Sequence, residues 1–388
     1  MCDKTVKIGI IGIGNMGTGH AQRISKGEIK GMKLVAVADK KESRRRWAEK
    51  ELPKDIKIYE DGEHLLDDPQ INAVLIAVPH YQHPKFSIKA MQKGIHVMCE
   101  KPVGVYTKQV LEVNTCAQNH PEVVFAVMFN QRTNPVYIRM HDMVQSGKYG
   151  SIKRVNWIIT DWYRTQHYYN SGDWRATWRG EGGGVLLNQC PHQLDLLQWI
   201  CGMPVRVRSF IHEGKWHDIE VEDDVTTYFE FENGATGVFI TSTGDAPGTN
   251  RFEVDLERAK IVCENNDLYV YELEVSEREY CFTASDGFAM PKGHVVKQDI
   301  RQENPQHNGV LQAFTDHILL GKPLIADGKE GINGLTLSNA MHLSSWTNAM
   351  VTIPFDEDEF LEKLNEKRSH SKAKTVVEEE IANLDGTY

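Results

Sequence analysis

Long apolar runs are missing from this chain of 388 residues. No uncharged apolar stretch approaches the roughly 18 residues that a helix needs to span a bilayer. Residues 1–4 also lack the apolar core of a secretory signal peptide. We therefore expect a cytoplasmic protein without a membrane partner.

An excess of positive charge is missing too. The 44 lysine and arginine residues are outnumbered by 54 aspartate and glutamate residues, which gives a formal net charge of −10. The one short basic run, 44–46, does not extend into the stripe of positive charge that nucleic-acid-binding domains present. Nucleic acid is therefore not an expected partner.

Paired cysteines are also lacking. The seven cysteines form an odd set without a Cys-x-x-Cys pair, which argues against a disulfide framework and against a structural zinc site. His212 and His217, with Glu213 and Asp218 nearby, do not have the spacing of metal ligands. We expect no bound metal.

Glycine, by contrast, is abundant and patterned near the start of the chain. An apolar run over 6–11 enters the sequence Gly-Ile-Gly-Asn-Met-Gly at 12–17, which predicts a strand, a tight turn and a helix. This spacing is typical of a dinucleotide-binding unit, in which backbone N–H groups at a helix N-terminus face a pyrophosphate. The residues of the turn predicted to bind the cofactor are Gly12, Gly14, Asn15, Met16 and Gly17.

Asp39 ends a second apolar run, 34–38, and is predicted to lie at the carboxyl end of the neighbouring parallel strand. A carboxylate there accepts hydrogen bonds from the adenosine ribose diol, which favours NAD. The basic residues Lys40, Lys41 and 44–46 follow directly and leave NADP possible. A solvated helix start is the simpler interpretation of these bases, because Asp39 would repel a 2′-phosphate.

The first 130 residues alternate short apolar runs with helical stretches. Such alternation predicts a parallel, doubly wound sheet, a Rossmann domain of the α/β class, whose carboxyl edge binds ligands. The predicted strands are 6–11, 34–38, 73–78, 96–99 and 123–127.

Residues 131–388 are predicted to form an α+β domain with a large open, mostly antiparallel sheet. Helices are expected at 136–145, 185–200, 307–320 and 332–349, and strands at 152–162, 205–212, 225–232, 236–241, 251–257 and 260–264. The tail 356–388 is predicted to be peripheral, with an amphipathic helix around 360–364. A sheet face left uncovered exposes apolar surface, so we expect a homodimer or homotetramer formed through the open sheet.

Two charged residues follow the predicted strand 96–99. Glu100 and Lys101 precede Pro102, at an edge where ligands bind. An ammonium there can bond a substrate hydroxyl and stabilise the alkoxide character that develops as hydride leaves carbon. An internal ion pair between Glu100 and Lys101 is the structural alternative, and the spacing does not decide between the two.

A run of three glycines, 182–184, precedes a second group of polar residues. If the glycines open a helix, Asn188 and His192 lie four residues apart on one face. His192 is suited to move a proton near neutral pH, as hydride transfer to or from a secondary alcohol requires. A hydrogen-bonded histidine at a helix start is the alternative, with Asp195 as its partner, and Pro191 marks a possible later start of the helix.

Aromatic and arginine residues fill the segment before these glycines. Aromatic faces stack on the apolar sides of sugar rings, and arginine bonds hydroxyl groups, so the segment predicts a substrate loop; an oligomer interface is the alternative. The residues predicted to bind substrate here are Tyr163, Trp174 and Arg175.

Taken together, these motifs resemble the Gfo/Idh/MocA oxidoreductase family from residue 6 to about 355. The resemblance implies a Rossmann domain followed by an α/β domain with an open sheet, and oxidation or reduction of sugars, inositols and related polyols with NAD(P). It also implies that Lys101 and His192 form the catalytic acid/base pair, and that Glu100 and Lys101 approach the nicotinamide ribose and substrate. Inositol-dehydrogenase-like members usually carry aspartate where this chain has Asn188. An amide cannot accept a proton, so we leave open whether His192 or Lys101 accepts it, and expect Asn188 to orient a hydroxyl.

The remaining predicted cofactor residues follow other strands of the first sheet. The backbone of Val78 and Pro79 is expected near a ribose, His83 matches a position common in the family, and Asn130 follows the fifth predicted strand.

The function expected from the sequence is an NAD-dependent dehydrogenase acting on a secondary hydroxyl of a sugar, glycoside or cyclitol. Two alternatives stay open: a glycosidase that uses NAD for transient oxidation and elimination, and a sensor whose nucleotide domain is not catalytic.

Overall fold

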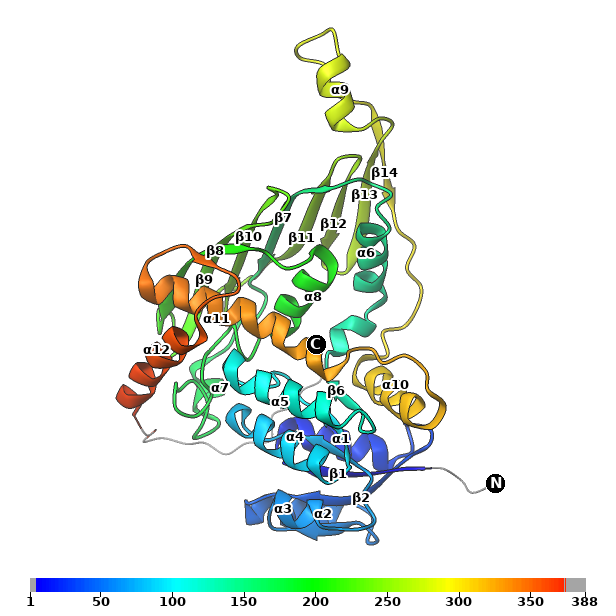
Figure 1. Ribbon diagram of the computed structural model, residues 1–388, viewed down its shortest axis with the longest axis vertical. Coiled ribbons are helices and arrows are strands. Elements are labelled where there is room, and N and C mark those ends of the chain that lie inside the picture. The colour runs from blue at the N-terminus through cyan, green and yellow to red at the C-terminus, as the bar shows by residue number, and fades with distance from the viewer. Residues whose placement is uncertain (1–4, 373, 375–388) are drawn as a thin grey trace.

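Two sheets, one above the other along the long axis, organise the chain (Figure 1). The computed structural model describes residues 5–372 and residue 374. In that part of the chain, no helix is both long and apolar enough to cross a membrane.

The first sheet has six parallel strands in the order β3-β2-β1-β4-β5-β6. Its strands are β1 (Val6–Ile11), β2 (Met32–Ala38), β3 (Lys57–Tyr59), β4 (Ala73–Ile76), β5 (His96–Cys99) and β6 (Phe125–Val127). All four residues of β4 are buried, because a central parallel strand is covered on both faces. The predicted doubly wound Rossmann sheet is confirmed.

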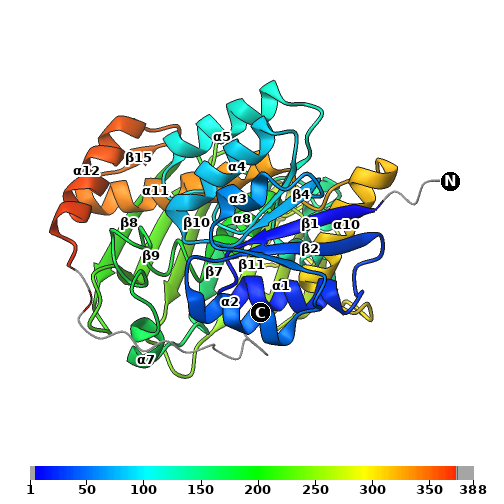
Figure 2. The same cartoon turned by 90° about the horizontal axis from the view of Figure 1, so that it is seen from below.

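Helices cover both faces of this sheet (Figure 2). One face packs on α3 (Gly62–Leu66), α4 (His83–Gln92) and α5 (Thr107–Asn119), and the other on α1 (Asn15–Ser25), α2 (Glu42–Glu51) and α10 (Gln306–Leu320). α10 belongs to the C-terminal part of the chain but packs on the first sheet. Its residues Val310 and Phe314 lie in the same hydrophobic core as Ile8 and Ile10 of β1.

The second sheet has nine strands in the order β14-β13-β12-β11-β7-β10-β9-β8-β15. Its pairings are antiparallel except for β7 with β10, so the sheet is mixed and mostly antiparallel, as expected. The strands are β7 (Ile152–Ile159), β8 (Arg206–Glu213), β9 (Glu222–Glu230), β10 (Thr236–Ser242), β11 (Asn250–Leu256), β12 (Ala259–Glu264), β13 (Asp267–Leu273), β14 (Gly293–Lys297) and β15 (Val351–Thr352).

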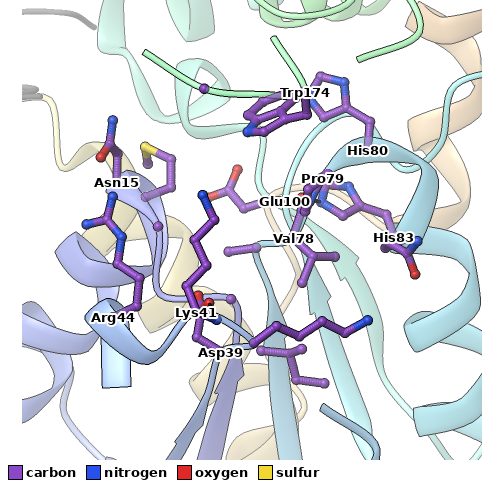
Figure 3. Close-up of a pocket in the computed structure, with 18 of the residues that line it drawn as sticks. Asn15, Asp39, Lys41, Arg44, Val78, Pro79, His80, His83, Glu100 and Trp174 are labelled. Atoms are coloured by element: carbon purple, nitrogen blue, oxygen red, sulfur yellow. Dashed lines mark hydrogen bonds between the residues drawn. The ribbon is translucent and has the colours of Figure 1, made fainter. Parts of the chain in front are cut away.

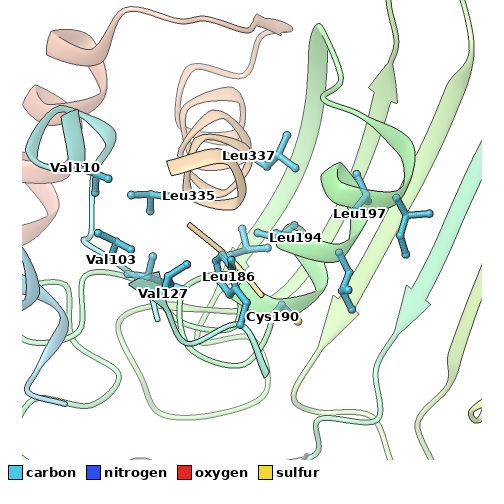
Figure 4. Close-up of a cluster of buried hydrophobic side chains, with 14 of the residues drawn as sticks. Val103, Val110, Val127, Leu186, Cys190, Leu194, Leu197, Leu335 and Leu337 are labelled. Carbon is cyan, nitrogen blue, oxygen red and sulfur yellow. The ribbon is translucent and has the colours of Figure 1, made fainter. Parts of the chain in front are cut away.

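One face of the second sheet carries the core, beneath α6 (Pro135–Gln145), α8 (Pro191–Cys201) and α11 (Gly331–Thr347). Trp157 of β7 stacks on Phe252 of β11 with ring centroids 4.0 Å apart. Toward the first domain, Val103 and Val127 pack with Leu194 and Leu335 in one buried cluster (Figure 4). The two domains thus share a hydrophobic core.

Shorter elements complete the described chain. They are α7 (Gln166–Asn170), α9 (Glu277–Thr283), α12 (Glu357–His370), and 3₁₀ turns at His80–Gln82, Asn130–Thr133 and Gly328–Glu330. α9 projects beyond the end of the second sheet, next to its edge strand β14 (Figure 1). In the tail, α12 buries Phe360 and Leu364, where the sequence predicts an amphipathic helix. Residues 375–388 of the predicted tail lie outside the described residues.

The helix predicted for 185–200 is wrong in its first six residues. α8 begins at Pro191, and residues 185–190 form turns instead. The helix starts at Pro191, the later start that the sequence left open, because proline has no N–H to donate to the preceding turn. The carboxylate of Glu222 on β9 holds the segment before it, accepting hydrogen bonds from the backbone N–H groups of Gly184 and Leu186 at 2.8 and 3.0 Å. Asn188 and His192 therefore do not share a helix face, because Asn188 precedes the helix.

Candidate active site

A cavity of about 520 Å³ opens at the carboxyl edge of the first sheet and reaches the second domain (Figure 3). It extends from the glycine turn after β1 to Lys101 after β5, with Trp174 and His80 on the side of the second domain. Predicted site residues that line it are Gly12, Gly14, Asn15, Met16, Asp39, Val78, Pro79, His83, Glu100, Lys101, Trp174, Arg175 and Asn188.

The glycine turn has the geometry that its spacing predicts. Gly12 has φ +90°, in the left-handed region that favours glycine. A Cβ atom on Gly17 would lie 1.9 Å from the carbonyl oxygen of Gly12, so no larger residue fits there without a shift. A Cβ on Gly14 would meet no atom within 4 Å, which leaves the cavity open to a ligand beside the N-terminus of α1.

Asp39 is held in place by two backbone donors. Its Oδ2 accepts from the N–H of Ile13 at 2.9 Å, and its Oδ1 accepts from the N–H of Lys41 at 2.8 Å. The first bond ties the end of β2 to the glycine turn, so the carboxylate is fixed at the wall of the cavity. Arg44 also lines this end. Arg45 instead donates to the carbonyl oxygens of residues 39 and 40.

His83 supports the loops that follow β4 and β5. Its Nδ1 lies 2.6 Å from the carbonyl oxygen of Pro102, and its Nε2 lies 2.7 Å from that of Val78. Burial lowers the pKa of His83. Since both ring nitrogens face backbone oxygens, His83 positions the cavity wall around Val78 and Pro79.

Glu100 pairs with a histidine and not with its neighbour Lys101. The Nε2 of His20 on α1 lies 2.7 Å from Oε1 of Glu100, and both side chains are buried. Burial alone would raise the pKa of Glu100, but the hydrogen bond and charge of His20 outweigh it and hold the pKa at about 2. His307 of α10 packs edge-on against His20. Glu100 is thus a fixed anion beneath Lys101.

Lys101 reaches across to the second domain. Its Nζ donates to the backbone carbonyl oxygen of Asn188 at 2.7 Å. Burial lowers the pKa of Lys101, against the opposite effects of Glu100 and Glu181. The Lys101 ammonium does not pair with the Glu100 carboxylate, so the internal ion pair considered as the alternative is not formed. An ammonium without a carboxylate partner can bind a substrate hydroxyl.

Glu181 is a buried carboxyl group behind this lysine that the sequence alone did not single out. Its Oε2 accepts from the N–H of Ala176 at 2.6 Å, and its Oε1 accepts from the side-chain amide of Asn188. Burial raises the pKa of Glu181 to about 7, although the charge of Arg175 acts the other way. Asn188 therefore joins this carboxyl group to Lys101.

His192 is buried on the first turn of α8, next to the ring of Phe129. Burial and then the charge of Lys101 lower its pKa well below the ordinary value, so the ring is neutral near pH 7. Its Nδ1 has no hydrogen-bond partner among the residues that the structure describes. A neutral imidazole with an unsatisfied buried nitrogen suits a group that exchanges protons with a ligand or water.

Other predicted site residues have different surroundings from those expected. Asp195 does not partner His192; both of its oxygens accept from the guanidinium of Arg132, at 2.7 and 2.8 Å. Asn130 is fully buried and donates to the side chain of Gln306. Tyr163 is 52% exposed. Of the predicted site residues, Gly17, Asn130, Tyr163 and His192 do not line the cavity.

The residues present fit a dinucleotide. The open space at Gly14, the N-terminus of α1 and the fixed Asp39 carboxylate lie in order along one cavity wall, and Lys101 is at its far end. This combination of a doubly wound sheet and a glycine turn defines an NAD-binding Rossmann domain, joined here to a domain that completes the cavity.

Comparison with known families agrees with that class. Residues 6–128 match the NAD-binding Rossmann-fold domain of the Gfo/Idh/MocA oxidoreductases, and residues 137–262 match the C-terminal domain of the same family. Since the two matches together cover more than half of the chain, this protein belongs to the Gfo/Idh/MocA family.

Two named relatives are inositol dehydrogenases. The chain is 24% identical to myo-inositol 2-dehydrogenase of Thermotoga maritima over 343 residues, which are 86% of this chain and 95% of that protein. It is 26% identical to inositol 2-dehydrogenase 2 of Saccharopolyspora erythraea over 233 residues, but this match spans 59% of the chain and 64% of the relative, less than two thirds.

Solved structures share the fold. The WlbA dehydrogenase of Chromobacterium violaceum, crystallised with NADH and UDP-GlcNAcA, superposes with a TM-score of 0.78 at 24% identity. The match covers 92% of this chain and 98% of that one.

Proposed function

We propose that this protein is an NAD-dependent dehydrogenase that oxidises a secondary hydroxyl of a sugar, glycoside or cyclitol, or reduces the matching ketone. One observation carries the proposal: a single cavity contains the glycine turn and Asp39 at one end and Lys101 with Asn188 at the other. The named relatives that act on inositols, and the neighbour solved with NADH and a nucleotide sugar, support this substrate class.

Lys101 is proposed to bind and polarise the reacting hydroxyl. When bound, the nicotinamide supplies a hydride acceptor. The Lys101 ammonium then stabilises the negative charge that develops on the substrate oxygen, an interaction that is strong in a site shielded from water. The carbonyl of Asn188 holds Nζ in place, and the Glu100 anion lies beneath it.

His192 is proposed to accept the hydroxyl proton, directly or through Lys101. Its neutral state near pH 7 leaves a ring nitrogen with a free lone pair, as a general base requires. Lys101 itself is the other candidate, because burial lowers its pKa and so favours the neutral amine, which can accept a proton. Asn188 orients the substrate and does not transfer the proton, because an amide is not a base.

We further propose that the open face of the second sheet joins subunits into a dimer or tetramer. Side chains on the face opposite the helices include Ile158, Phe210 and Tyr271, which are 37%, 55% and 41% exposed. Light scattering tests this: the purified protein should be oligomeric, and an Ile158→Glu, Tyr271→Glu double variant should shift toward a monomer.

The function is tested by adding NAD and a panel of sugars, inositols and aryl glycosides while recording absorbance of the reduced nicotinamide and analysing products. Stoichiometric formation of NADH supports the dehydrogenase. Release of an aglycone without net NADH would favour the redox-assisted glycosidase instead. Binding of NAD without any turnover across the panel would favour the sensor.

A further inference from the structure

Arg175 places a second cation beside Lys101 in the cavity. Its guanidinium carbon lies 4.6 Å from the ring centre of Tyr168 and 4.9 Å from that of Trp174. One of its terminal nitrogens, Nη1, donates to the Tyr168 hydroxyl at 2.8 Å. Two aromatic contacts and a hydrogen bond restrict the side chain, so the guanidinium is held in a defined position at the cavity wall.

This guanidinium makes no direct ion pair with a carboxylate of the described residues. Over residues 5–372 and 374, Arg175 forms no ion pair, and its side chain donates its hydrogen bond to the phenol oxygen of Tyr168. The charge of Arg175 acts on buried Glu181, but both carboxyl oxygens of Glu181 accept from Ala176 and Asn188. Most of the five N–H donors of Arg175 are therefore left for a ligand.

The acidic residues that line the cavity do not neutralise this end. Asp39 is bonded by the backbone near the glycine turn, and Asp61 accepts from the backbone at the start of α3. Glu100 pairs with His20, and exposed Asp173 makes no ion pair with Arg175. A neutral polyol needs no pair of cations, whereas a planar guanidinium fork matches the two oxygens of a carboxylate or phosphate.

Resting on the dehydrogenase proposed above, we propose that the substrate carries an oxyanionic group, a carboxylate or a phosphate, which Arg175 binds while Lys101 binds the reacting hydroxyl. Trp174 and Tyr168 then serve to position the guanidinium. The specificity of the site for acidic over neutral sugars comes from Arg175, because charge-assisted hydrogen bonds are about twice as strong as neutral ones.

The test measures binding of probe sugars to the full-length protein saturated with NADH, by calorimetry. The probes are D-glucuronate, D-glucose 6-phosphate and neutral D-glucose. We expect one of the acidic probes to bind about 10- to 100-fold tighter than D-glucose. Which acid prevails distinguishes a carboxylate from a phosphate as the recognised group.

Variants assign the effect to Arg175. Arg175→Gln should abolish the preference for the acid, and Arg175→Lys should retain part of it, because the charge remains without the fork. Arg179→Gln is the matched control, since the Arg179 side chain lies in the same segment and is exposed. Thermal melting verifies that each variant is folded, and the lysine variant decides the question if the glutamine variant is not.

Three results would overturn the inference. They are equal or undetectable binding of acidic and neutral probes by the wild type, an acid preference that survives Arg175→Gln, and a loss of NADH affinity in that variant as large as its loss of acid affinity. Because binding is measured without turnover, a selective protein that forms no NADH would contradict the dehydrogenase and leave the acid site supported.

Discussion

The Lys101 ammonium, at the end of β5, donates a hydrogen bond to the backbone carbonyl oxygen of Asn188, 2.7 Å away in the second domain. The second domain thereby positions Lys101, the candidate catalytic residue of the first domain. Because the acceptor is a backbone oxygen, the same hydrogen bond can form whether residue 188 is aspartate or asparagine. The departure of this chain at Asn188 therefore leaves the placement of Lys101 intact.

Replacing Lys101 by methionine should lower kcat by about 10²- to 10⁴-fold, the range typical of a lost acid/base group. The methionine keeps an apolar stem of similar length, so binding of NADH should change little. Steady-state kinetics and NADH titration measure the two effects. Lys93→Met, at a lysine whose side chain is 44% exposed, is the control. Turnover within threefold of wild type would remove Lys101 from the mechanism.

His192→Gln should change the pH profile as well as the rate. Burial keeps the pKa of His192 below its ordinary value near 6.5, so the neutral base persists into mildly acidic solution. The acid limb of kcat/KM in the wild type should therefore lie below pH 6.5, and it should be lost in the variant along with most of the rate. His64→Gln, on an exposed side chain, should keep the profile. An unchanged acid limb in His192→Gln would point to a different base.

Asp39→Asn should weaken the preference for NAD over NADP by at least about tenfold, because a carboxylate repels a 2′-phosphate and like charges in contact cost several kcal/mol. Asparagine keeps a side-chain oxygen that can accept from Ile13, so the glycine turn should stay in place. The ratio of kcat/KM for the two cofactors is the measurement. A ratio unchanged by the substitution would show that other residues set the preference.

Sequence reasoning located most of the fold because periodicity is a local property. β1 and β5 have the bounds predicted for them, since a charged or glycine residue follows each apolar run. The three-residue β3 and β14, whose five residues are all exposed, were not predicted, because neither shows an alternation that distinguishes a strand from a loop. The parallel pairing of β7 with β10 depends on contacts about 80 residues apart, which no local pattern reports.

The site was predictable only where function depends on a motif. The glycine turn, Asp39 and Lys101 line the cavity as expected, since each follows directly after a strand of the first sheet. No site role was predicted for Glu181, because its place in the site depends on burial and on contacts with Ala176 and Asn188. These contacts form only when the chain folds. The partner of Asp195 was assigned wrongly for the same reason: Arg132 lies 63 residues away in the chain.

Asp195→Asn should destabilise the protein by about 2–3 kcal/mol, because it breaks the bidentate pair with the buried guanidinium of Arg132, which keeps only its second carboxylate partner, Glu330. The Arg132 and Asp195 side chains are nearly inaccessible, at 2% and 1% exposed. Urea unfolding at pH 7 measures the effect. The control is Asp55→Asn, which breaks the exposed pair of Asp55 with Lys33 and should cost no more than about 1 kcal/mol. Equal losses in the two variants would contradict the structural role given to the buried pair.

Glu181 should make the protein less stable as pH rises from about 4.5 to 7. Burial raises the pKa of Glu181 from 4.5 to about 7 in the folded state, so over this interval the native carboxyl keeps a proton that the unfolded chain has released. Stability falls with pH wherever the native state holds more protons, and the full shift corresponds to about 3 kcal/mol. Glu181→Gln removes the titration and should flatten this part of the pH dependence of the unfolding free energy, relative to wild type. Glu112→Gln, on an exposed helix position, should leave the wild-type slope unchanged, and a slope that persists in Glu181→Gln would place the titrating group elsewhere.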